Sequence, residues 1–220
     1  MTSPTYNQAL LEMASQSLAE LARTAAQKAG KRTPAQESHC LCSWMAESLK
    51  EKRFSRLVME DLKEWVQLGR TLGAGADLKG LLERIIRQYE RATCEPLQLG
   101  SKLAALLAEL AAEGWLVITD SEVSAKLRLQ SGGQPSLIIS ASEYQGNIEA
   151  GELVKPLTLY VRGDEARLAQ GAFTHGLLLS QGNKKTTLVK PHKAYRLVPG
   201  NALPALALLA GPCKECLPFV

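Results

Sequence analysis

The sequence is poor in aromatic residues. Phe, Trp and Tyr make up 5% of its 220 residues, whereas Ala and Leu are abundant. A core built from such residues is aliphatic, and we expect it to be largely helical, with strands where Val, Ile and Thr collect. This composition predicts a mixed α and β protein with a substantial core.

The sequence also lacks complete catalytic signatures. It has no GxSxG elbow, Walker loop, GxGxxG turn or HExxH helix. Its histidines, His39, His175 and His192, have no recognisable partner in the sequence. One stretch contains Asp120, Glu122 and Lys126, which are residue types that metal-dependent nucleases use to hold Mg²⁺ and orient water. Their spacing, however, differs from the usual nuclease pattern of an acidic residue followed by Glu-x-Lys. We therefore predict that the protein is not an enzyme.

No segment of the sequence is typical of membrane insertion or secretion. A secretory signal consists of a basic segment, then an apolar core, then a small-residue cleavage site, and this order is not found near Met1. The apolar run Ala202–Ala210 contains Pro204 and is about half the ~20 residues needed to span a bilayer. We expect a cytoplasmic protein without a membrane partner.

The cysteines permit two interpretations. Their number, 5, is odd, which favours reduced thiols or a metal site over a disulfide framework. Two short pairs, Cys40 with Cys42 and Cys213 with Cys216, could together hold a zinc ion, because thiolates are ligands that zinc prefers. The alternative is that all of them are free thiols.

Apolar residues recur at helical spacing in the first half of the chain. The pattern predicts helices over residues 7–28, 43–68, 78–89 and 101–113. Asp77 is a suitable N-cap for the third of them. Near Trp115 the period changes from 3.6 to 2, which marks the start of a strand-rich half.

The first strands are predicted to form a hairpin. Val123, Ala125, Leu127 and Leu129 alternate with polar residues, and Leu116–Thr119 precedes them across the turn Asp120-Ser121. Helices followed by such a hairpin resemble a winged helix-turn-helix over roughly residues 60–130, an architecture of DNA-binding proteins. The resemblance implies that the hairpin is the wing.

Short strands are then predicted between Ser136 and Val198. Gly182-Asn183 suits a hairpin turn between residues 175–180 and 185–190, which would put Leu177, Leu179 and Leu188 on one face. The prediction is an α+β fold with a winged-helix-like helical part and a C-terminal antiparallel sheet that carries a basic hairpin. Its regions are 1–72, 73–133 and 134–220.

Positive charge is concentrated in this second half. The net charge is +4 and the sequence pI is 8.8, but between residues 155 and 196 there are eight Lys and Arg against two acidic residues. Such cations can neutralise phosphates, or they can simply protect edge strands from aggregation. The candidate phosphate contacts are Lys184, Lys185, Lys190, Lys193, Arg196, Arg162, Lys126, Arg128, Arg84, Arg87 and Arg91.

These features favour a non-catalytic nucleic-acid-associated subunit. It would bind DNA or RNA through the backbone within a replication, mobile-element or CRISPR-type effector assembly, while Ala/Leu-rich helices dock other protein subunits. The helix Ser101–Glu113 lacks the Arg, Asn or Gln set that reads bases, which argues against sequence-specific binding. The alternative is a protein-interaction adaptor or oligomer without a nucleic-acid role.

Overall fold

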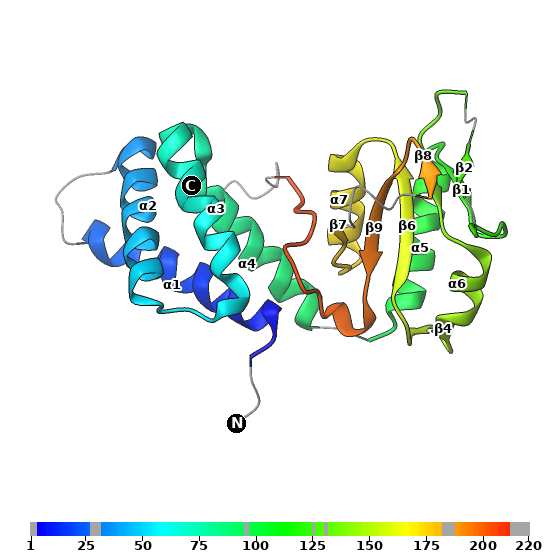
Figure 1. Cartoon of the computed structure of the whole chain (residues 1–220), viewed down its shortest axis with the longest axis horizontal. Coiled ribbons are helices and arrows are strands. Elements are labelled where there is room, and N and C mark those ends of the chain that lie inside the picture. Colours follow the sequence, from blue (N-terminus) through cyan, green and yellow to red (C-terminus); the bar gives the residue numbers. More distant parts are fainter. Residues whose placement is uncertain are drawn as a thin grey trace, which may run out of the picture. The chain divides into compact units, whose positions relative to one another are not determined.

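A computed structural model gives the fold of the chain. It describes residues 4–26, 32–94, 97–124, 126–129, 132–181 and 188–211. The chain divides into two compact units, of which the first ends at Glu90 and the second spans Arg91–Gly211 (Figure 1). The predicted three-region division, with limits after residues 72 and 133, stays a prediction.

The first unit is helical. Its core is made of apolar side chains that face inward from each helix, among them Leu10, Met13, Met45, Leu62 and Ile85. The helices are α1 (Tyr6–Ala26), α2 (Pro34–Glu51), α3 (Met59–Leu72) and α4 (Leu78–Cys94), the last of which continues into the second unit, with short 3-10 turns η1 (Arg56–Val58) and η2 (Gly73–Ala76).

Local chemistry sets the ends of these helices. Thr33 and Gln36 form a capping box at the start of α2, and Pro34 occupies its first turn. Lys52 adopts a left-handed conformation with φ of 53° and ends α2. The predicted single helix over residues 43–68 is therefore wrong, because the chain breaks after α2. The prediction for Asp77 is confirmed, since its Oδ1 accepts a hydrogen bond from the Gly80 amide at 3.2 Å.

The second unit contains a mixed, mostly antiparallel sheet. Its strand order is β1-β3-β6-β9-β7, and only β1 and β3 run parallel. The strands of this sheet are β1 (Leu116–Ile118), β3 (Ser136–Ile138), β6 (Leu157–Arg162), β7 (Ser180–Gln181) and β9 (Lys193–Leu197). The predicted α+β class, with a sheet in the C-terminal part, is confirmed.

Smaller elements surround this sheet. A parallel pair is formed by β2 (Leu127–Arg128) and β8 (Val189–Lys190), and an antiparallel pair by β4 (Ile148–Glu149) and β5 (Glu152–Leu153). The helices of the unit are α5 (Leu99–Ala112), α6 (Ala141–Gly146), α7 (Glu165–Thr174) and the 3-10 turn η4 (Pro199–Asn201).

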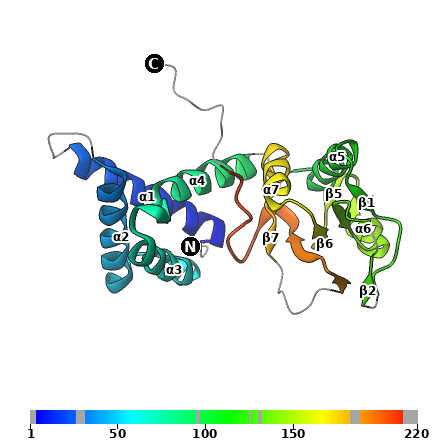
Figure 2. The same ribbon diagram turned by 90° about the horizontal axis from the view of Figure 1, so that it is seen from above.

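The two faces of the sheet differ. Leu103 and Leu106 of α5 and Leu168 of α7 pack on one face, so both helices lie on the same side of the strands (Figure 2). Side chains alternate along β6, so Leu157, Leu159 and Val161 face these helices while Thr158, Tyr160 and Arg162 face the other way. We call this second side the free face. It carries a smaller apolar cluster of Val123, Ile138, Tyr160 and Val189.

The predicted hairpin over residues 116–129 is wrong. β1 pairs in parallel with β3, and β2 pairs in parallel with β8, so the two strands are not partners. The alternation in this stretch specifies an extended, half-buried segment but not its neighbour. Since the hairpin was to be the wing, the winged-helix resemblance is not confirmed.

The predicted basic hairpin is not confirmed either. Residues 182–187, including Lys184 and Lys185, lie outside the described residues. On either side of them β7 pairs with β9, and β8 pairs with β2. Leu177 and Leu179 join the core under the helices, whereas Leu188 packs against the cluster on the free face, so the three do not share a face. Within the described residues, no helix is long and apolar enough to cross a membrane.

Candidate nucleic-acid interface

The pairing of β2 with β8 brings together basic residues that lie far apart in the sequence. In this pair the backbone of Arg128 is in register with that of Lys190. Lys126 comes directly before β2, and the side chains of Lys126 and Lys190 are both exposed. We call Lys126, Arg128 and Lys190 the basic ribbon.

An apolar base holds β8 against the free face. Val189 is fully buried and packs with Ile138 and Tyr160. Tyr160 is itself buried in this cluster, and its pKa is raised by burial and then by the nearby Glu143 carboxylate. The exposed cation of Lys190 is therefore anchored by an apolar neighbour in the same strand.

His192 joins β8 to β9 beneath the ribbon. It is 3% exposed, its Nε2 lies 2.9 Å from the hydroxyl of buried Ser136, and its amide donates to the Val189 carbonyl at 2.9 Å. Burial, followed by the positive charge of Arg162, lowers the pKa of His192. The imidazole is therefore neutral near pH 7 and belongs to the support of the ribbon.

The cations of β9 divide between the two faces of the sheet. Lys193 forms an ion pair with Glu165 of α7, with 2.9 Å between Nζ and Oε1. Arg196 is exposed, and its register partner Thr158 lies on the free face. Half-buried Arg162 also faces that side. Arg162 and Arg196 thus share the free face with the apolar cluster that anchors β8, whereas Lys193 does not.

The arginines of α4 do not form one open stripe. Arg84 donates from Nε to the Gly80 carbonyl of its own helix at 3.1 Å. Arg87 is half-buried. Arg91 donates to the carbonyls of Phe173 and Thr174 at 3.0 and 2.8 Å. Arg91 therefore has a structural role at the end of α7, which the spacing of the basic residues could not indicate.

The structure does not describe the remaining candidate contacts, either because the whole residue or because its side chain lies outside the described residues. Lys184 and Lys185 belong to residues 182–187, and the side chain of Arg128 is likewise not described. Their roles stay predictions. Because residues 182–187 directly precede Leu188 and β8, they belong to the same part of the sequence as Lys190.

Cys40 and Cys42 lie on different sides of α2. The sulfur of Cys42 donates to the Val66 carbonyl of α3, and that of Cys40 lies 3.5 Å from the Thr24 hydroxyl of α1. Residues two apart in a helix point in different directions, so the two sulfurs have separate partners in this structure. Cys213 and Cys216 lie outside the described residues, and the described part of the chain holds no group of three or more potential metal ligands. The shared zinc site stays a prediction.

Glu122 has a structural role that accounts for its position. Its carboxylate accepts hydrogen bonds from the hydroxyls of Ser140 and Ser142, both at 2.9 Å, and from the Ser142 amide at the start of α6. These bonds, those of Ser142 and Ser140 first, lower the pKa of Glu122. The carboxylate thus fastens residues 120–124 to α6.

The sequence did not indicate a charged network between α5 and α7. Arg167 of α7 donates to Glu109 of α5 and to Glu113, the residue that caps the end of α5. Nε2 of His175 lies 2.6 Å from Glu109. The hydrogen bond with His175, then that with Arg167, lowers the pKa of Glu109. The spacing of the two glutamates, one helical turn apart, was the available signal, but their partner lies more than 50 residues away.

The chain belongs to the family described as "Protein of unknown function (DUF2913)", because the model of that family matches residues 5–210. No curated protein and no solved structure matches the sequence.

Proposed function

We propose that this protein is a non-catalytic nucleic-acid-binding subunit that contacts the phosphate backbone with the free face of its second unit. The observation that carries the proposal is the β2–β8 pairing, in which the backbones of Arg128 and Lys190 are in register. Arg162 and Arg196 extend the positive charge across the same side of the sheet.

The electrostatics of the ribbon support an anionic partner. Neither Lys126 nor Lys190 forms an ion pair with any residue in the described ranges, and the same holds for Arg196. Like charges on neighbouring strands repel each other. Phosphates laid along the ribbon would relieve this repulsion and release condensed counterions, which makes binding strongly dependent on salt.

The position of α5 supports backbone contacts over base reading. Its leucines are buried against the sheet, and its exposed residues include Ala104, Ala105, Ala108 and Ala111. This helix lacks the Arg, Asn or Gln side chains that typically read base edges. We therefore expect little preference for sequence.

The test is the affinity of the full chain for fluorescent single-stranded and double-stranded oligonucleotides of DNA and RNA. The variant Lys126→Glu with Lys190→Glu reverses two ribbon charges. The control Lys50→Glu with Lys63→Glu reverses two exposed charges of the first unit and changes the net charge equally. The proposal expects the ribbon variant alone to lose at least tenfold in affinity. Equal losses in both variants would contradict a local interface.

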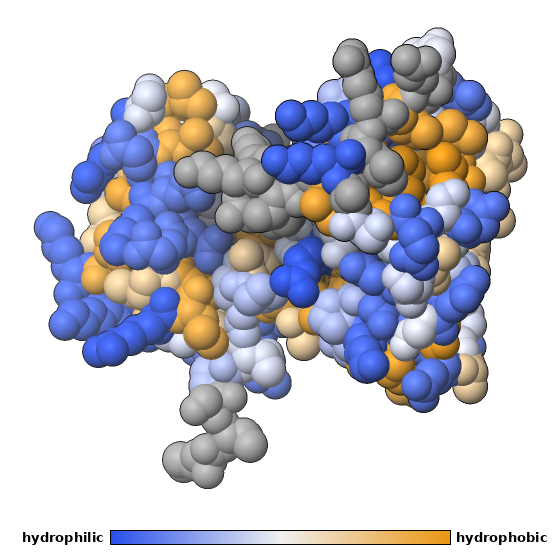
Figure 3. All heavy atoms as spheres, turned by 45° about the vertical axis from the view of Figure 1, so that its right-hand side comes forward, coloured by the Kyte–Doolittle hydropathy of each residue, from blue (hydrophilic) through white to orange (hydrophobic). Residues whose placement is uncertain are grey.

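The alternative function, a protein-interaction adaptor or oligomer, has its own support. The exposed alanines of α5 allow another helix or sheet to approach closely. The free face also has half-buried apolar residues, Ile118, Leu129 and Leu188. Figure 3 shows hydrophobic side chains gathered on the upper part of this unit, where Figure 1 places β1, β2 and β8. Sedimentation of the pure protein tests this role: self-association without nucleic-acid binding would favour the adaptor.

A further inference from the structure

The chain covers one edge of the five-stranded sheet and leaves the other uncovered. At β7, Ser180 forms a bridge with Ala207, and the Leu208 amide donates to the Leu179 carbonyl at 2.7 Å, so a later segment of the chain lies along that edge. At the opposite edge, β1 pairs only with β3 within the described residues. The sheet of the second unit therefore ends at β1.

The backbone of β1 has hydrogen-bonding groups that point away from β3. The Leu116 amide and the Ile118 carbonyl both bond to the segment that contains β3, at 2.8 and 2.9 Å. Because the backbone groups of successive residues in a strand point to opposite edges, those of Val117 and Thr119 face outward. In the described part of the chain, neither of these two backbones has a hydrogen-bond partner at the outer edge.

This edge carries none of the features that protect exposed strands from pairing. Lysine and proline are common at such edges, but Trp115–Thr119 contains no charged residue and no proline. The side chains of β1 are only half-buried. Unpaired backbone groups among apolar side chains favour the addition of another strand.

The helix beside this edge has an uncharged surface. α5 packs on β1, and the Trp115 amide donates to the Leu110 carbonyl at 3.0 Å. Helix faces that remain in water normally carry charged side chains. Every exposed residue of α5 is instead small and uncharged: Ser101, Ala104, Ala105, Ala108, Ala111 and Ala112. Such a surface allows another helix to approach closely.

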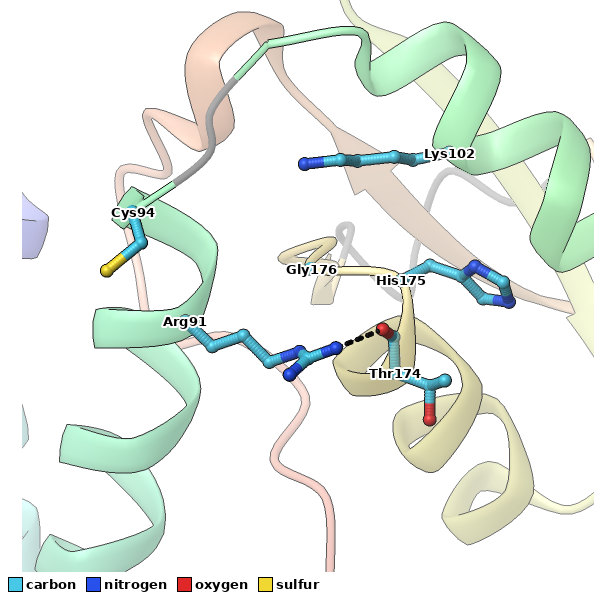
Figure 4. Close-up of a pocket in the computed structure, with 6 residues that line it drawn as sticks. All are labelled: Arg91, Cys94, Lys102, Thr174, His175 and Gly176. Carbon is cyan, nitrogen blue, oxygen red and sulfur yellow. Dashed lines mark hydrogen bonds between the residues drawn. The ribbon is translucent and has the colours of Figure 1, made fainter.

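The charged residues of α5 lie on the side that faces α7. Arg167 of α7 binds Glu109, and Lys102 lines a cavity with residues at the end of α7 (Figure 4). With about 100° between successive residues, Ala104 and Ala111 lie on the opposite side of the helix. Because α7 is bonded to β9 while α5 packs on β1, that side of α5 is directed toward the open edge of the sheet.

We propose that two copies of the chain associate through β1, in antiparallel pairing about a two-fold axis at Val117. In this pairing the two Val117 residues exchange both of their outward hydrogen bonds. Each Thr119 amide meets the Trp115 carbonyl of the other copy. The two sheets become one, and both open edges are removed.

The sequence around β1 is compatible with itself in this register. The apolar side chains of the strand lie opposite one another across the axis. Glu113 falls opposite Ser121 of the other copy. Asp120 falls opposite Gly114, so no like charges meet. A second copy therefore supplies a strand whose charges and apolar residues suit this edge.

The same axis brings the two α5 helices side by side. They run antiparallel, with Ala104 beside Ala111 of the other copy, and these small side chains permit the separation of about 8–10 Å at which helices pack. Because the axis is perpendicular to the sheet, the two free faces lie on the same side of the dimer. Dimer formation itself requires no nucleic acid.

The experiment is sedimentation velocity of the full chain over a range of concentrations, without nucleic acid. We expect a monomer–dimer equilibrium. Ala104→Glu places a charge at the contact between the α5 helices and should raise the dissociation constant of the dimer at least about tenfold. The matched control Ala166→Glu, which makes the same change at an exposed position of α7, should leave that constant unchanged.

Amide hydrogen exchange then identifies the surface. Where the dimer dominates, the Val117 and Thr119 amides should exchange at least about tenfold more slowly than in dilute, monomeric protein. A chain that stays monomeric at every concentration would overturn the proposal, as would a dimer that Ala104→Glu and Ala166→Glu weaken equally. Exchange at both amides that does not change on dimerisation would overturn it as well.

Discussion

His192 is a buried base whose protonation opposes folding. Its pKa is lowered in the folded protein by burial and by Arg162, whereas in the unfolded chain it takes up a proton below about pH 6.5. Below that pH the unfolded state binds more protons, so the free energy of unfolding falls as pH falls. Above it, His192 contributes no pH dependence.

We therefore predict that His192→Gln makes the free energy of unfolding less dependent on pH between pH 7 and 5. For one proton the largest slope is about 1.4 kcal/mol per pH unit. Urea unfolding at several pH values measures this slope. The substitution also changes the hydrogen bond with Ser136, so the pH dependence of the free energy of unfolding is decisive and its absolute value is not. Identical pH dependence in both proteins would refute the lowered pKa of His192.

Asn201 joins three segments of the second unit. It is fully buried, has a φ of 54°, donates to the carbonyls of Ala92 and Gly176, and accepts from the Leu178 amide. Replacing it with Ala leaves these buried groups without partners. We predict that Asn201→Ala lowers the free energy of unfolding by roughly 2–3 kcal/mol.

Asn147 provides the matched comparison for this measurement. Its side chain donates one hydrogen bond, to the Pro156 carbonyl, at an exposed position. Asn147→Ala should therefore cost under about 1 kcal/mol in the same urea experiment. If the two variants lost equal stability, the special role of Asn201 would be disproved.

Helices α5 and α7 are joined by Arg167. Its Nε lies 2.6 Å from Oε2 of Glu113, and it also binds Glu109, with its own side chain 24% exposed. Partly buried, multiply bonded ion pairs contribute more than isolated surface pairs. We predict that Arg167→Met lowers the free energy of unfolding by about 1–2 kcal/mol.

Arg23 is the control for this element. It pairs with Glu20 one turn away on α1, and its side chain is 59% exposed. Arg23→Met should leave thermal unfolding nearly unchanged. If Arg23→Met lowered the unfolding temperature as much as Arg167→Met, the ion pairs between α5 and α7 would contribute no more stability than an exposed pair.

At this level the sequence predicted elements better than their partners. The leucine period of α5 and the capping role of Asp77 follow from local spacing, and both are found in the structure. Lys52 shows the limit, because no glycine or proline marks its left-handed turn. Local patterns indicate which face of an element is buried. They do not indicate where the chain breaks after α2.

For the whole molecule, the missing information is which strands meet. The alternation around Leu127 predicted a strand, of which the structure has Leu127–Arg128, but the partner of Leu127, Val189, lies more than 60 residues away. Long-range pairing depends on the complete core, so a local pattern could not reveal it. The same pairing unites Lys126 and Lys190, which the sequence had assigned to two separate hairpins.

One measurement tests the nucleic-acid interface most directly: the salt dependence of oligonucleotide affinity for the unmodified protein, the Lys126→Glu and Lys190→Glu variant, and the Lys50→Glu and Lys63→Glu control. Each lost phosphate contact reduces the slope of log affinity against log salt by about 0.9 for duplex DNA and about 0.7 for single strands. We predict a steep slope for the unmodified protein and the control, and a slope smaller by about 1.4–1.8 for the ribbon variant. Equal slopes in all three, or no binding at low salt, would contradict a phosphate-binding free face.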